Sequence, residues 1–162
     1  SLFPAVIKAR NNSETLYEER VQKLYDLMIW GSVAVALPTT LFADWVILIL
    51  YGSDFQKADD VLRIYIWAGV FVSLGVACSK WLVAENLQRY LFYITALGAV
   101  LNISCNLWLI PIYGIKGAAL ATIISYSTAT YFSLGCFRKT RKTFWTATNS
   151  LNPHAVLRRS FR

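Results

Sequence analysis

Four long apolar stretches dominate the sequence and limit what the chain can fold into. They run over about 27–50, 61–84, 91–111 and 117–137. A helix needs about 20 residues to cross the roughly 30 Å hydrocarbon core of a bilayer, and each stretch is long enough. Only 15% of the residues are charged, whereas a soluble domain carries about 25%. The sequence therefore predicts an all-α, polytopic bundle of four transmembrane helices with the lipid bilayer as its solvent.

Lysine and arginine are distributed unequally between the two sides of this predicted bundle. With four crossings, the segments outside the helices alternate between the sides. One side carries Lys57, Arg63 and Lys116. The other side, with Lys80 near the same face, carries Lys8, Arg10, Arg20, Lys23, Arg89, Arg138, Lys139, Arg141, Lys142, Arg158, Arg159 and Arg162. The positive-inside rule therefore predicts that both termini are cytoplasmic.

The polar segments at the two ends have separate predicted roles. We interpret residues 1–26 as the end of a preceding helix followed by a cytoplasmic amphipathic helix over 13–26, with Tyr17 and Val21 on one apolar stripe. Residues 138–162 are a basic cytoplasmic tail, which we interpret as an orientation signal attracted to anionic headgroups. A nucleic-acid-binding arm is the alternative, but a position directly after a membrane helix favours lipid, so no nucleic-acid partner is expected.

Small residues recur at helical spacing on two of the predicted crossings. Helices in lipid pack closely where small side chains let their backbones approach, which predicts packing faces here. The positions are Gly69, Ser73 and Ala77 on the second crossing, and Ala118, Thr122, Ser125 and Ala129 on the fourth. The alternative is that alanine and glycine are simply common in membrane helices.

Residues 111–117 predict a tight external turn between the third and fourth crossings. Pro111 is expected to stop one helix, and Gly114 and Gly117 permit the chain to reverse. Antiparallel neighbours need only a short connection, so these two crossings should form a helical hairpin.

Three polar residues share one face of the third crossing. Thr95, Asn102 and Asn106 recur at spacings of seven and four residues. Amides that face lipid are costly, so this face should point into the bundle or a watery cavity. Two interpretations stay open, namely hydrogen bonding between helices and the lining of a substrate cavity.

Two charged residues inside the predicted crossings are further cavity candidates. A carboxylate such as Asp44 costs about 2.5–3.5 kcal/mol at mid-membrane, which raises the possibility of a site for a proton or cation. The alternative places Asp44 at the interface or in a solvated cavity, because Pro38 can kink the helix before it. Lys80 has a long stem that can snorkel toward the cytoplasmic face.

Residues that could support catalysis or hold a metal are sparse. Cys78, Cys105 and Cys136 show neither CxxC nor Cys/His spacing, and His154 is the one histidine. The sequence has no glycine-rich phosphate loop, no paired-carboxylate motif on one helix and no nucleophile near a histidine. We therefore expect no metal, no cofactor and no enzyme activity.

Four segments carry a resemblance to a known family. They are LFPAVIKAR at 2–10, LILYGSDFQKADDVLRI at 48–64, LVAENLQRY at 82–90 and NISCNLWLIPIYGIKGAALATIISY at 102–126. In this order they resemble the C-terminal part of the polysaccharide flippases of the multidrug/oligosaccharidyl-lipid/polysaccharide exporter superfamily. The resemblance extends to about residue 137 and leaves the basic tail outside.

The resemblance implies a function in surface polysaccharide biosynthesis. It implies two facing helical bundles in a bacterial inner membrane that move polyprenyl-linked repeat units of O-antigen, capsule or exopolysaccharide to the outer leaflet. It also implies transport driven by an ion gradient, which would give Asp44 a possible role. Thr95, Asn102 and Asn106 are then the leading candidates for the cavity.

Two other interpretations stay open, and a third is disfavoured. The chain could belong to a multidrug or peptidoglycan-precursor exporter of the same superfamily, or to a non-transporting membrane scaffold subunit. A membrane glycosyltransferase would need larger external segments than 52–60 and 111–117. Because the chain opens at Ser1 and has fewer crossings than the resemblance implies, we expect a fragment of a longer protein or a degraded gene product.

Overall fold

The structure, a computed structural model, describes residues 13–136, 140–153 and 156. These residues form helices joined by short turns, and three of the helices are long and apolar enough to cross a membrane. They are α2 (Glu14–Leu41), the consecutive pair α4 (Asp59–Tyr65) and α5 (Ala68–Ala84), and α6 (Gln88–Tyr113). The predicted all-α membrane bundle is therefore confirmed.

The fourth predicted crossing, 117–137, is helical but interrupted. α7 (Ile115–Ser127) is followed by a π-helical segment, η2 (Thr128–Phe132), and by the short α8 (Ser133–Cys136). Because η2 divides this stretch, each of its pieces is shorter than the three spanning helices.

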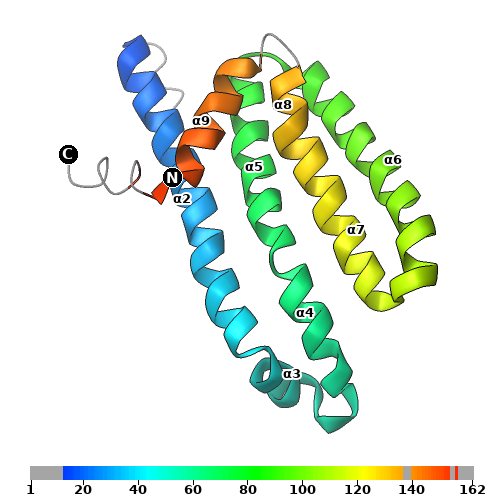
Figure 1. Ribbon diagram of the computed structural model, residues 1–162. Helices are drawn as coiled ribbons and strands as arrows, with labels where there is room; N and C mark the ends of the chain where they lie inside the picture. Colours follow the sequence, from blue (N-terminus) through cyan, green and yellow to red (C-terminus); the bar gives the residue numbers. More distant parts are fainter. Residues whose placement is uncertain (1–12, 137–139, 154–155, 157–162) are drawn as a thin grey trace.

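The helical rods lie side by side in the order α2, α4–α5, α7–α8 and α6 (Figure 1). At one end, called the α3 end, α3 (Ala43–Tyr51) and the 3-10 helix η1 (Ser53–Ala58) connect α2 to α4. At the opposite end, called the α9 end, α9 (Arg141–Leu151) crosses α2 and α5 (Figure 1). The two predicted external segments, 52–60 and 111–117, both lie toward the α3 end.

The core is densest toward the α9 end, where α2, α5, α8 and α9 meet. Tyr25, Leu82, Leu134 and Ala147 are fully buried there. By contrast, α6 leaves large apolar side chains such as Trp108 exposed, at 71% of the maximum. Lipid tails are as apolar as these side chains, so a spanning helix can leave them outside the protein core.

The N-terminal half of the bundle differs from the prediction. We expected an amphipathic helix over 13–26 and a separate crossing over 27–50, but α2 runs unbroken through that boundary. Nothing in the sequence at residue 26 removes a helical hydrogen bond, as a proline would. The break falls instead at Phe42, whose N–H donates to the Pro38 carbonyl at 2.9 Å. The predicted end of a preceding helix, before residue 13, lies outside the described residues.

The turn between α6 and α7 is shorter than predicted. Pro111 does not stop α6, because it lies in the last helical turn, where the Gly114 N–H still closes the helix by donating to the Ile110 carbonyl at 2.8 Å. The reversal occurs at Gly114, which has φ 59°. Gly117 lies in the first turn of α7, where an added Cβ would be 2.2 Å from the Leu109 carbonyl oxygen. Gly117 therefore serves close packing of the hairpin.

Part of the predicted basic tail, 138–162, is a helix packed on the bundle. Thr143 and Ser150 of α9 are buried against it. From α2, Gln22 Nε2 donates to Ser150 Oγ at 2.5 Å and Trp30 Nε1 donates to the Ser150 carbonyl at 2.9 Å. Contacts of α9 with α2 therefore hold this segment against the bundle. Residues 138, 139, 154, 155 and 157–162 lie outside the described residues.

Replacing Trp30 by phenylalanine should loosen the end of α9. The substitution keeps an aromatic ring but removes the donor to the Ser150 carbonyl, a loss of about 1 kcal/mol. Hydrogen exchange of the α9 amides should become faster, whereas exchange in α6 should not change. Trp108→Phe, at an exposed position of α6, is the matched control. Unchanged exchange in α9 would show that this hydrogen bond does not hold the helix.

Candidate functional site

A groove of about 580 Å³ runs between α5, α6 and the α7–η2 rod. Thr95 and Asn102 line it from α6, Ser125 and Thr130 line it from α7 and η2, and Gly75 lies on its α5 wall. All the residues that line the groove are uncharged. The groove therefore suits a neutral ligand, or the neutral part of a larger one.

The two asparagines of α6 have different positions relative to this groove. Asn102 Nδ2 donates across to Ser125 Oγ at 3.1 Å, and Asn106 Nδ2 donates to Asn102 Oδ1 at 2.9 Å. Asn102 thus joins two helices and also lines the groove, whereas Asn106 lies beyond its lining. Asn106 Oδ1 is buried, and the part of the chain that the structure describes supplies it with no donor. The hydrogen bond from Asn102 to Ser125 supports the interpretation that the polar face of α6 makes hydrogen bonds between helices.

Hydroxyl groups in the groove already donate to backbone carbonyls. Thr95 Oγ1 donates to the Leu91 carbonyl at 2.9 Å, and Thr122 Oγ1 donates to the Ala118 carbonyl at 2.9 Å. A hydroxyl has one donor hydrogen but two acceptor lone pairs. These groups can therefore accept hydrogen bonds from a ligand, such as the hydroxyls of a sugar, more readily than they can donate.

Asp44 lies at the α3 end, beyond the end of the spanning helix α2. Its side chain is 62% exposed, and Arg63 Nη2 donates to Asp44 Oδ1 at 2.5 Å. The hydrogen bond from Arg63 lowers the pKa of the Asp44 carboxyl. Arg63 Nη1 also donates to the Thr40 carbonyl at 3.2 Å, near the end of α2. This position agrees with the interfacial interpretation of Asp44.

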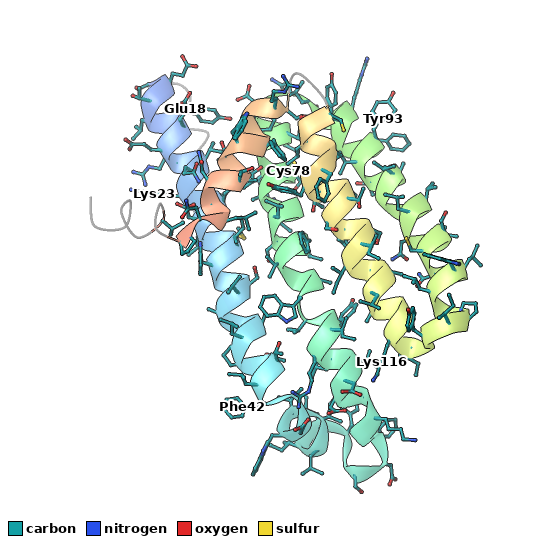
Figure 2. The ribbon with its side chains drawn as sticks, in the orientation of Figure 1. Glu18, Lys23, Phe42, Cys78, Tyr93 and Lys116 are labelled. Carbon is teal, nitrogen blue, oxygen red and sulfur yellow. The ribbon has the colours of Figure 1, made fainter. Side chains whose placement is uncertain are left out.

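A second ion pair joins α4 to α7 at the same end. Lys116 Nζ lies 2.6 Å from Asp60 Oδ2, and Figure 2 shows the Lys116 side chain directed from the start of α7 toward α4. Asp44, Asp59, Asp60 and Arg63 line a depression of about 650 Å³ there. Neither pair was predictable from helical spacing, because only the Asp59–Arg63 separation of four residues is local. Lys80 is exposed on α5, outside the groove lining.

The small residues predicted to pack do so unevenly. Ala77 and Ser125 are buried, as is Ala129, while Ser73, Ala118 and Thr122 are half-buried. A Cβ added at Gly69 would meet no atom within 4 Å, so the described residues show no close helix approach at this glycine. It lies directly after the break between α4 and α5. Close approaches also occur at Gly75 and Gly98, which the spacing pattern did not select.

Comparisons with known proteins identify flippases. Residues 1–153 match the family described as lipid II flippase MurJ. A probable low-salt glycan biosynthesis flippase of Haloferax volcanii is 28% identical over 134 residues, covering 80% of this chain and 28% of that protein. Two uncharacterized membrane proteins of Methanocaldococcus jannaschii also match. One is 38% identical over 76 residues, covering 47% of this chain and 18% of the relative. The other is 28% identical over 119 residues, covering 72% of this chain and 22% of that relative.

These matches cover most of this chain's sequence in the family comparison but only part of each relative. The chain spans less than a third of the length of each relative, and no solved structure matches it. These matches confirm the flippase superfamily that the sequence resemblance implied, while the polysaccharide branch is not specified. Because the family match covers nearly the whole sequence, the chain belongs to the lipid II flippase MurJ family.

Proposed function

We propose that this chain is part of a flippase that moves a polyprenyl-linked oligosaccharide across the cytoplasmic membrane, with both ends of the chain on the cytoplasmic side. The observation that carries the proposal is the family match over residues 1–153. The three helices that are long and apolar enough to cross a membrane support it, and so does the uncharged groove, whose hydroxyl oxygens can accept hydrogen bonds from a sugar.

The groove between α5, α6 and α7 is the proposed contribution of this chain to the path. Thr95 and Asn102 line it and offer acceptor oxygens, and Asn106 supports Asn102 from one side. Asp44 and Lys80 are lesser candidates. Asp44 would bind a coupling ion only after its ion pair with Arg63 is broken.

Two lipid-linked substrates have specific support. A glycan repeat unit for surface polysaccharide is favoured by the Haloferax relative, which is named as a glycan biosynthesis flippase. A peptidoglycan precursor is favoured by the family description, lipid II flippase. Both have a polyprenyl anchor and a neutral sugar portion, so the groove does not distinguish them.

The parent gene should be deleted in its host, and the lipid-linked intermediates on the cytoplasmic side should then be measured. Accumulation of a polyprenyl-linked repeat unit would assign polysaccharide export, and accumulation of a peptidoglycan precursor would assign the alternative. Restoration of normal levels by the full-length gene is the control. A host that accumulates no lipid-linked intermediate would contradict the flippase proposal.

Asn102→Leu in the full-length parent should reduce translocation. The change removes a ligand-facing amide from the groove, and the loss of one or two hydrogen bonds predicts roughly a three- to tenfold lower rate. Ser125→Ala removes the partner of Asn102 across the helices but keeps its amide, and should therefore cost less. Ser104→Leu, at an exposed position of α6, is the matched control. Equal rates in Asn102→Leu and the wild type would remove Asn102 from the path.

A further inference from the structure

The outer face of α3 is apolar, although this helix lies at the end of the bundle. Ala43 and Ile47 are buried against the bundle. On the opposite side, Trp45 and Ile49 are 67% and 76% exposed, and Leu48 beside them is exposed as well. Residues four apart in a helix share a face, so each of these two pairs marks one side of α3. The helix therefore presents one face to the bundle and a separate apolar face to its surroundings.

Other large apolar side chains extend this surface at both ends of α3. Leu41 and Phe42 are exposed where α2 ends, and Tyr51 and Phe55 are exposed at the end of α3 and in η1. Figure 2 shows the Phe42 ring directed away from α4. Soluble monomers rarely leave an extended apolar patch in water, and a patch of this kind binds protein or membrane. Lipid and protein are therefore the two candidates for what covers this surface.

The length of the apolar part of α2 favours lipid. Asp26 is the last charged residue of α2, and about 15 residues follow it up to Leu41, a length of about 22 Å. The hydrocarbon core of a bilayer is roughly 30 Å thick. With Asp26 at the headgroups of one leaflet, the end of α2 does not yet reach the headgroups of the other. The helix α3 therefore begins at a depth where acyl chains surround the protein.

The α4–α5 rod leads to the same depth. About 16 uncharged residues separate Arg63 from Lys80, a length of about 24 Å. Arg63 connects this level to α3, because it donates to the Thr40 carbonyl at the end of α2 and to the Asp44 carboxylate. The two rods that adjoin α3 therefore both place it at the inner edge of the headgroups.

The direction of α3 and its polar side fit a helix that lies in the membrane interface. Figure 1 shows the rods along their length but α3 nearly end-on beyond the end of α2, so α3 lies across the rods. The charged side chains beside it line the depression between α3, η1 and α4. An interfacial helix likewise keeps polar groups on one side and large apolar side chains on the other. Trp45 lies at the border, since it also lines the depression, and tryptophan is enriched at this depth of a membrane.

We propose that α3 lies flat in the lipid interface of the leaflet at the α3 end, with Trp45, Leu48 and Ile49 in contact with acyl chains. The ion pair with Arg63 holds the polar side of α3 against α4, and the apolar side anchors this end of the bundle in the leaflet. The partner is the surrounding lipid, so the anchor does not depend on which substrate the parent carries.

The test measures the depth of single spin labels in the full-length parent, reconstituted without substrate in vesicles of phosphatidylcholine and phosphatidylglycerol. Each variant carries one accessible cysteine, introduced as Trp45→Cys, as Ile49→Cys or, for a reference in water, as Asp54→Cys on η1. Depth follows from collisions of the label with oxygen, which concentrates in lipid, and with a water-soluble nickel chelate. We expect both α3 labels about 5–10 Å into the boundary between headgroups and acyl chains, and the Asp54 label in water.

The two α3 labels should also lie at similar depths, because a helix that lies flat keeps residues four apart at one level. The matched control is the pair Leu37→Cys and Leu41→Cys, two exposed positions with the same spacing on the rod α2. A helix along the membrane normal separates residues four apart by about 6 Å in depth. We therefore expect a difference of about 6 Å within the control pair and of less than about 2 Å within the α3 pair.

Three outcomes would overturn the proposal. Nickel collisions at Ile49 as frequent as those at Asp54 would place α3 in water. Low collision rates with both reagents at Ile49 would show that protein, such as another part of the parent, covers this face. A depth difference of about 6 Å between the Trp45 and Ile49 labels would show that α3 runs along the membrane normal as the rods do.

Discussion

Gly117→Leu should prevent α6 and α7 from packing as a hairpin. The Cα of Gly117 faces the α6 backbone so closely that even a Cβ would lie 2.2 Å from the Leu109 carbonyl oxygen and 2.6 Å from its carbon. Backbone atoms cannot rotate away as the end of a side chain can. Overpacking costs about 1–3 kcal/mol where neighbours can adjust. We therefore expect a loss of about 3 kcal/mol or more of unfolding free energy.

The measurement is thermal unfolding of the purified chain in detergent, followed by circular dichroism and by size-exclusion chromatography. Gly31→Leu is the matched control, because a Cβ at Gly31 meets no atom within 4 Å. The control should unfold near the wild-type temperature, whereas Gly117→Leu should aggregate or unfold well below it. Equal unfolding temperatures for the two variants would show that the α6–α7 contact is looser than the structure describes.

The sequence predicted the helical stretches better than their ends. Hydropathy reports the composition of a window, and three of the predicted stretches overlap a helix long enough to span a membrane. Where each helix stops depends on which backbone hydrogen bonds survive. Pro111 lacks an amide hydrogen, but it lies in the last turn of α6, which the Gly114 N–H closes by donating to the Ile110 carbonyl. The helix α6 therefore continues past Pro111. The break at Phe42 follows Pro38 by four residues. The mean hydropathy of a window does not report where such a break falls.

The candidate site was predictable where it depends on one helix and not where it depends on two. The spacing of Thr95 and Asn102 places both on one face of α6, and both line the groove. The partner of Asn102 is Ser125, 23 residues away, and the Lys116–Asp60 pair spans 56 residues. Periodicity contains no information about such pairs. They follow from how the rods pack, which the sequence alone left open.

The glycines show the same limit. The small-residue pattern selected Gly69 but not Gly75, although both belong to α5 and only Gly75 meets a neighbouring rod. A stripe of small residues predicts that helices can approach closely, without showing which turn of the helix the neighbour reaches. Here that turn is fixed by η2, a π segment that no local feature of the sequence indicated.

Arg63→Glu should detach α3 from α4. Arg63 holds the Asp44 carboxylate at 2.5 Å, donates to the Thr40 carbonyl at 3.2 Å and lies 3.8 Å from Asp59 Oδ2. A glutamate in its place removes these interactions and brings like charges together. Exposed single ion pairs contribute little, but this side chain joins three elements, and reversal adds repulsion to the loss. We expect the α3 amides to lose their protection from hydrogen exchange, while those of α6 keep theirs.

Exchanging the two charges should restore the contact, because the attraction does not depend on which helix carries the cation. Asp44→Arg combined with Arg63→Asp should therefore regain protection of α3, although the Thr40 carbonyl would lose its donor. The wild-type pair also predicts a pH dependence. Because Arg63 lowers the folded pKa of Asp44, the pair stabilises α3 fully above the ordinary carboxyl value of 3.8 and loses this effect as the pH falls through the lowered value. Protection of α3 that fails to return in the exchanged variant, or that changes between pH 8 and about pH 5, would show that the Arg63–Asp44 pair does not hold α3 in place.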